Sequence, residues 1–198
     1  MCIRDSQTTT TQQVSIANET AVSTTSSGTS VSQATAAASS SQNQSKYEAN
    51  VASVAGKMDN RVIAAYQQLG FKIVVDPSVN YSGYFDARSR SITMKQIDDS
   101  VYHELGHFLA FIAGNVDKTA SFQSIFAAEK ANVTAFNKAY VTQNASEYFA
   151  ESVKDYILNN ASLKSTRPQT YAAVQNALNQ ITDAQIAKIQ KIYGAFWN

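Results

Sequence analysis

Both histidines of this 198-residue chain lie in one motif, His103-Glu104-Leu105-Gly106-His107. Histidines four residues apart project from one face of a helix, so both imidazoles can bind one Zn²⁺ at about 2.0–2.1 Å. The glutamate between them can accept a proton from a water molecule held at the metal. The motif therefore predicts one zinc ion per chain, with His103 and His107 as ligands and Glu104 as the general base of a hydrolase.

A catalytic zinc usually has a third protein ligand, with water in the fourth position. Because the chain has no third histidine, a carboxylate is expected. Glu147 and Glu151 are four residues apart, so they share one face of a helix. Spacing leaves two assignments open: either Glu147 binds zinc and Glu151 accepts a hydrogen bond from a ligand histidine, or Glu151 binds zinc and Asp155 has the supporting role. A solvated acidic helix face would account for the same spacing.

Two helices must position these residues, and the sequence predicts both. Asp98, Asp99 and Ser100 offer N-caps ahead of an apolar pattern that predicts a helix over Val101–Ala113. A second helix, which carries the two glutamates, is expected over Ala145–Asn159.

Gly106 lies inside the first of these helices, where glycine costs about 1 kcal/mol relative to alanine. Two explanations are open. Another backbone or side chain approaches the helix closely at this point, or the helix simply tolerates the glycine. The first explanation would make Gly106 part of the geometry of the site.

Further patterns complete the predicted fold. β-branched and aromatic residues predict a strand over Phe71–Val75 and a hairpin formed by Tyr84–Asp86 and Ser91–Lys95. Other helices are expected at Val51–Leu69, Ala120–Lys130, Pro168–Asn179 and Asp183–Tyr193. This order predicts an α+β fold, in which a small N-terminal antiparallel or mixed sheet with an active-site helix precedes a mostly helical C-terminal half.

The first part of the chain differs in character from the rest. Ser, Thr, Gln, Ala and Asn dominate residues 7–45, Glu19 is the one charged residue there, and every aromatic residue lies at Tyr47 or beyond. Such a segment cannot bury enough apolar surface to fold. We therefore predict a disordered linker over residues 1–46, with residues 1–6 as a candidate non-native addition, and one folded domain over residues 47–198.

Composition excludes several classes of protein. A net charge of +1 provides no excess of basic side chains for nucleic-acid binding, and the longest apolar run, Phe108–Gly114, is too short to span a bilayer. Cys2 is the single cysteine, so neither a disulfide framework nor a thiolate zinc site can form within the chain. A polar tether before a cysteine-free domain predicts a secreted bacterial protein, extracellular or associated with the cell wall, and we expect a monomer.

The histidine motif, Tyr140 and the segment Asn144-Ala-Ser-Glu-Tyr-Phe-Ala-Glu151 together resemble the catalytic domain of anthrax toxin lethal factor and its small secreted relatives, the Pro-Pro endopeptidases. In that family a tyrosine precedes the ligand glutamate by seven residues, as Tyr140 precedes Glu147. The resemblance implies a zincin-like fold with Glu147 as the third zinc ligand. It also implies Glu151 as the partner of a ligand histidine and Tyr140 as the hydroxyl donor to the developing oxyanion. Single-domain size after a polar segment fits the Pro-Pro endopeptidases better than the toxin.

The predicted function is that of a secreted zinc endopeptidase acting on protein or peptide substrates, with Pro-Pro sites as a candidate specificity. Family members lay an extended peptide along a sheet edge, and we expect it at Ser91–Lys95, just before the motif helix. Two alternatives remain. A surface-attached binding or adhesion module would hold a structural or inactive zinc site, which needs neither Glu104 nor Tyr140. A chance motif in a helical partner-binding domain would bind no stoichiometric zinc.

Overall fold

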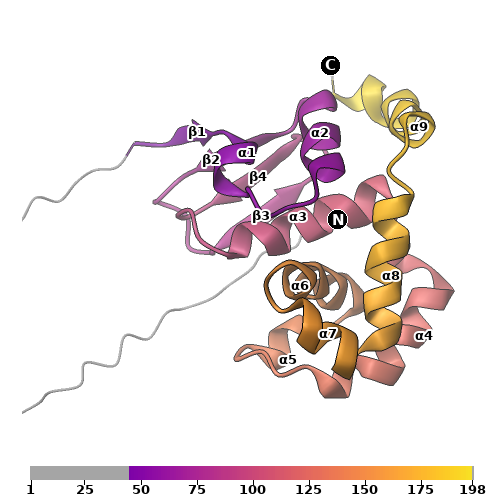
Figure 1. The fold of residues 1–198 in the computed structure, drawn as a ribbon. Coiled ribbons are helices and arrows are strands. Elements are labelled where there is room, and N and C mark those ends of the chain that lie inside the picture. The colour runs from indigo at the N-terminus through magenta and orange to yellow at the C-terminus, as the bar shows by residue number, and fades with distance from the viewer. Residues whose placement is uncertain (1–44, 198) are drawn as a thin grey trace, which may run out of the picture.

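The computed structural model of the chain describes residues 45–197 (Figure 1). Cys2, the candidate non-native residues 1–6 and nearly all of the linker predicted over residues 1–46 lie outside the described residues, so these remain predictions. The strands are β1 (Tyr47–Ala49), β2 (Lys72–Val75), β3 (Gly83–Asp86) and β4 (Ser91–Met94). The helices are α1 (Val51–Val54), α2 (Asn60–Gln68), α3 (Ser100–Ile112), α4 (Ala120–Glu129), α5 (Lys138–Val141), α6 (Ala145–Leu158), α7 (Asn160–Thr166), α8 (Pro168–Asn179) and α9 (Asp183–Tyr193), with short 3₁₀ helices η1 (Val116–Lys118), η2 (Lys130–Asn132) and η3 (Gly194–Phe196).

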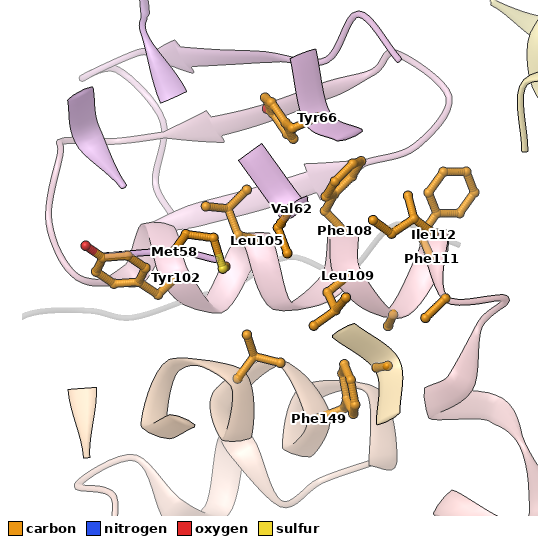
Figure 2. Close-up of a cluster of buried hydrophobic side chains, with 14 of the residues drawn as sticks. Met58, Val62, Tyr66, Tyr102, Leu105, Phe108, Leu109, Phe111, Ile112 and Phe149 are labelled. Atoms are coloured by element: carbon orange, nitrogen blue, oxygen red, sulfur yellow. The ribbon is translucent and has the colours of Figure 1, made fainter. Parts of the chain in front are cut away.

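The α+β class and the helical C-terminal half are confirmed. Figure 1 shows the small sheet and α2 on one side of α3, with α6, α7 and α8 on the other side. Helix α3 therefore lies between the two parts of the fold and contributes to the core on several faces, as the buried side chains Leu105, Phe108 and Leu109 show (Figure 2). Within residues 45–197, no helix is both long and apolar enough to cross a membrane.

The sheet is mixed, with strand order β1-β2-β4-β3. Strand β2 pairs with β4 in parallel, and β3 pairs with β4 antiparallel as the hairpin predicts. Strand β4 therefore has a neighbour on both sides, and its residues Ile92 and Met94 are fully buried. The expectation that Ser91–Lys95 offers the sheet edge to a peptide is wrong, because the parallel β2–β4 pair leaves β3 as the free edge on this side of the sheet.

One other local expectation is wrong and three short elements were not predicted, while α8 and α9 have the predicted bounds. The single helix predicted over Val51–Leu69 is two helices, because Asn50 and Asp59 each cap a separate start: the Asn50 side chain accepts from the amide of Ala52, and that of Asp59 accepts from the amide of Arg61. The sequence analysis also missed β1, α5 and α7, which have 3, 4 and 7 residues. Elements this short depend on tertiary packing rather than on their own sequence pattern.

Candidate metal centre

The site begins with the crossing of α3 and α6. A Cβ atom placed on Gly106 would lie 2.7 Å from both the Cα atom and the carbonyl oxygen of Ala150 on α6. Any side chain at position 106 would therefore push the two helices apart. Of the two explanations for this glycine, the structure supports close approach: the contact brings the histidine face of α3 against the glutamate face of α6.

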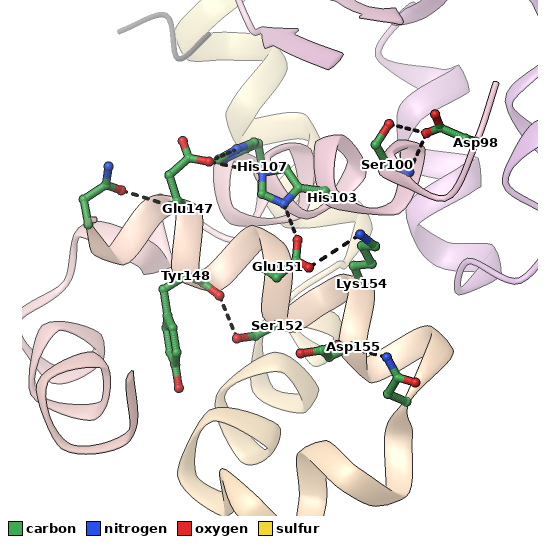
Figure 3. Close-up of polar contacts among 12 residues, drawn as sticks. Asp98, Ser100, His103, His107, Glu147, Tyr148, Glu151, Ser152, Lys154 and Asp155 are labelled. Carbon is green, nitrogen blue, oxygen red and sulfur yellow. Dashed lines mark hydrogen bonds and ion pairs between the residues drawn. The ribbon is translucent and has the colours of Figure 1, made fainter. Parts of the chain in front are cut away.

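Three side chains from these two helices converge (Figure 3). The Nε2 atoms of His103 and His107 lie 3.2 Å and 3.7 Å from Oε2 of Glu147. Ligand atoms around a tetrahedral zinc with bonds of about 2.1 Å are roughly 3.4 Å apart. The other carboxylate oxygen of Glu147 is buried and has no hydrogen-bond partner among the described residues. The spacing, the donor atoms and this unsatisfied oxygen all fit a divalent cation such as zinc.

Glu151 supports the cluster from the next turn of α6. Its Oε2 atom lies 2.9 Å from Nδ1 of His103, where the ring N–H can donate to the carboxylate, and Lys154 lies 3.5 Å from its other oxygen. Asp155 lies away from the histidines and pairs with Arg167 instead. The structure thus matches the arrangement in which Glu147 faces the metal position and Glu151 orients His103, and it does not bring Asp155 into the site.

The carboxylate of Glu104 lies under the first residue of the edge strand β3. Glu104 is 2 % exposed, and a Cβ atom on Gly83 would lie only 2.5 Å from its Oε1 atom. Strand β3 therefore passes directly over the predicted general base, and it can do so because residue 83 has no side chain. Sequence reasoning did not identify Gly83, since nothing in the local pattern indicates what a strand residue packs against.

Tyr140 lies on α5, the short helix that precedes and packs against α6. Its ring is partly buried against the core, and its hydroxyl oxygen is buried. The role of this tyrosine as an oxyanion donor remains a prediction. Tyr148, next to Glu147, is fully buried and its hydroxyl bonds to that of Thr170, which is a packing role.

The electrostatics of the cluster favour positive charge between the three side chains. Burial acts to lower the pKa of His103, but hydrogen bonds to Glu147 and Glu151, together with the charge of Glu104, raise that pKa to about 10. Burial lowers the pKa of His107 below its ordinary value, against the opposing effect of Glu147. Burial alone would raise the pKa of Glu147, yet the two histidines hold it well below its usual range. Glu147 is therefore ionised, as a metal ligand must be.

Two hollows border the cluster. One, of about 190 Å³, is lined by His103, Glu151 and Lys154. The other, of about 650 Å³, reaches His107 and has an aromatic wall that includes Phe85 and Phe111. Each of the two histidines therefore borders one hollow.

Two comparisons show which known proteins the chain resembles. Residues 86–177 match a family model described as anthrax toxin lethal factor, N- and C-terminal domain. A protein of Clostridioides difficile (strain 630) named Pro-Pro endopeptidase is 41% identical to the chain over 78 residues, which cover 37% of this chain and 34% of the relative. The match thus spans about a third of the relative's length. The similarity to lethal factor and to a Pro-Pro endopeptidase, expected from the sequence, is confirmed.

Proposed function

We propose that this protein is a zinc-dependent endopeptidase. One observation carries the proposal: one ring nitrogen each of His103 and His107 and a carboxylate oxygen of Glu147 lie within 4.8 Å of one another. Among residues 45–197 this group contains three potential ligands rather than four. Three protein ligands are typical of catalytic zinc sites, whereas structural sites are closed by four.

His103, His107 and Glu147 would hold the ion. When bound, zinc would polarise the scissile carbonyl and lower the pKa of a coordinated water toward about 7. Glu151 fixes the His103 ring by accepting from its Nδ1–H, which leaves Nε2 directed at the metal position. Both carboxylates that contact this ring come from α6, since Glu147 and Glu151 lie on consecutive turns of that helix.

Glu104 is the proposed general base. In the proposed reaction its carboxylate takes the proton from the attacking water and returns it to the leaving amine. Its burial beneath β3 keeps bulk water away from this proton transfer. Tyr140 is the proposed hydroxyl donor to the oxyanion, a type of contact that typically contributes about 10²–10³ in kcat.

We propose that the substrate pairs with β3 rather than with β4. Strand β3 is at the edge of the sheet, and its first residue, Gly83, lies against Glu104. An extended peptide added along this edge would bring its backbone over the general base. Pro-Pro bonds are the candidate cleavage site, by analogy with the name of the matched relative. The proposed setting is outside a bacterial cell, free or associated with the wall, and the proposed active form is a monomer; the polar, cysteine-poor sequence supports secretion.

The test combines metal analysis with substrate discovery. The purified protein is incubated with a diverse peptide library, with and without a chelator, and cut sites are read by mass spectrometry. Chelator-sensitive cleavage with one zinc per chain, lost in Glu104→Gln while zinc is retained, supports the proposal. Stoichiometric zinc with no cleavage of any peptide would instead support a binding or adhesion module with a structural site. Absence of zinc would indicate a chance motif.

A further inference from the structure

The larger hollow beside His107 is completed by the C-terminal end of the chain. Tyr193, Phe196 and Trp197 line it together with Phe85 and Phe111. We call this hollow the C-terminal pocket. The match to the lethal factor family ends at residue 177, so the three C-terminal aromatic residues lie beyond the matched region. This wall of the pocket therefore lies outside the matched segment.

The C-terminal segment is fixed to the hairpin that carries the edge strand. The indole N–H of Trp197 donates to the carbonyl oxygen of Ala87 at 2.9 Å, and the guanidinium of Arg90 donates to the carbonyl oxygen of Trp197 at 3.2 Å. Arg90 also lies over the Trp197 ring, 5.5 Å from its centroid. These contacts hold η3 against the β3–β4 turn, so the aromatic wall is built before any ligand binds.

The wall forms a continuous aromatic path from the metal position outward. The Phe85 ring stacks with that of His107, with centroids 6.5 Å apart, and contacts Phe111 at 6.2 Å. Phe111 meets Tyr193 edge to face at 4.9 Å, and Tyr193 stacks on Trp197 at 6.0 Å. An apolar group that enters beside His107 therefore meets ring faces and edges along this wall of the pocket.

The charged residues that line the pocket are poorly placed to bind a charged group of a ligand. The Asp86 carboxylate already accepts from the amide of Arg88 and the hydroxyl of Ser89, and the buried carboxylate of Asp117 accepts from the hydroxyl of Ser146. The basic side chains that line it, Arg88 and Lys118, are exposed, so their charged ends remain in water. A ligand would therefore remove most apolar surface from water by covering the aromatic wall.

We propose that the C-terminal pocket binds a bulky apolar side chain, aromatic or large aliphatic, of the substrate peptide on the His107 side of the cleaved bond. The inference rests on the proposed peptidase function. The C-terminal pocket has a volume of about 650 Å³, which lies within the roughly 300–1,000 Å³ of typical ligand sites. Phe196, which is 70 % exposed, would be covered by that side chain and would help to select it.

The kinetic test compares two exposed residues of the same C-terminal segment. Phe196→Ala removes part of the pocket wall, whereas Ile192→Ala removes a side chain that is 49 % exposed and does not line the pocket. Peptides with Phe or Leu at the position that faces the pocket are compared with the same peptides carrying Ala. We expect Phe196→Ala to lower kcat/KM about tenfold for the bulky peptides and little for the Ala peptides. Equal effects on both peptide types, or the same loss in Ile192→Ala, would overturn the inference.

A binding test needs no turnover. Trp197 is the one tryptophan of the chain, so its fluorescence reports on the pocket directly. The inactive variant Glu104→Gln is titrated with the same peptides, and a saturable change in emission with the bulky peptides but not with their Ala counterparts is expected. If the wild type cleaves peptides without any preference at this position and Trp197 emission stays constant, the pocket assignment fails while the peptidase proposal stands. If no peptide is cut but bulky peptides still shift the emission, the peptidase proposal fails while the pocket remains a binding site.

Discussion

Replacing Gly106 with alanine should weaken zinc binding more than it weakens the fold. The new Cβ would start 2.7 Å from two backbone atoms of Ala150, while carbon atoms in contact are normally about 3.5–4.0 Å apart. The two helices must therefore separate by roughly 1 Å. Because the contacted atoms of Ala150 are backbone atoms of α6, a change of side-chain rotamer cannot relieve the overlap.

The two energetic effects of Gly106→Ala have opposite signs. Overpacking of this kind costs about 1–3 kcal/mol, and the higher helix propensity of alanine returns about 1 kcal/mol. The expected net loss is therefore up to about 2 kcal/mol, which corresponds to a decrease in Tm of no more than about 8 °C for a domain of this size. The metal site tolerates a smaller separation of the helices than the fold does, because metal–ligand distances vary by only about 0.2 Å.

A separation of roughly 1 Å takes the carboxylate of Glu147 out of bonding distance of an ion held by the two histidines. We expect zinc affinity to fall by at least 10–100-fold, the range seen when only a supporting partner of a ligand is lost. Competition with a chromogenic chelator measures the affinity, and thermal unfolding of the metal-free protein measures the stability. Gly194→Ala is the matched control, because a Cβ at that position has no neighbour within 4 Å. Wild-type zinc affinity together with a higher Tm in Gly106→Ala would refute the close helix contact.

Three further predictions concern the same site. Glu147→Gln should abolish tight zinc binding, whereas Glu151→Gln should lower the affinity by about 10–100-fold; equal losses in metal titrations would contradict the separate roles of the two glutamates. Gly83→Ala should displace the Glu104 carboxylate, with Oε1 only 2.5 Å from the new Cβ, and lower kcat by up to about 10² without changing zinc content; an unchanged kcat would show that β3 does not restrain the base. In the metal-free protein the pKa of His103 is raised from 6.5 to about 10, so its protonated form stabilises the fold fully below pH 6.5, and this contribution is lost as the pH rises toward 10. The Tm of chelator-treated protein should fall across that interval, while zinc affinity should rise with pH as protons leave the ligands; a flat Tm profile would argue against the His103 contacts with Glu147 and Glu151.

The sequence predicted the elements that have their own periodic pattern and clear ends. Helix α8 begins at Pro168, and α9 follows the capping Thr182, so both have the expected bounds. Residues of the metal cluster were also accessible to prediction, because helical spacing determines which side chains share a face. The sequence could not predict where the two helix faces meet, since this depends on the packing of Gly106 against Ala150, which is 44 positions later in the chain.

The order of the strands in the sheet also could not be predicted from the local sequence pattern. The pattern of Ser91–Met94 predicts a strand, but the pairing partners are chosen by packing across the whole sheet. The parallel pairing with β2 turned the expected edge into a central strand and gave the edge position to β3. The C-terminal aromatic residues carry no recognisable motif, and their contribution to a pocket beside His107 appears only in three dimensions.

The buried carboxylate of Glu147 ties the metal to the fold itself. Glu147 has no exposed surface, and one of its oxygens lacks a hydrogen-bond partner among the described residues. An unsatisfied buried polar group costs about 1–3 kcal/mol, and more when it is charged. A core residue of this kind is unfavourable unless a cation compensates for it. Because the same crossing of α3 and α6 forms both the core and the ligand set, zinc bound there would stabilise the packing of the two halves of the protein as well as supply its proposed chemistry.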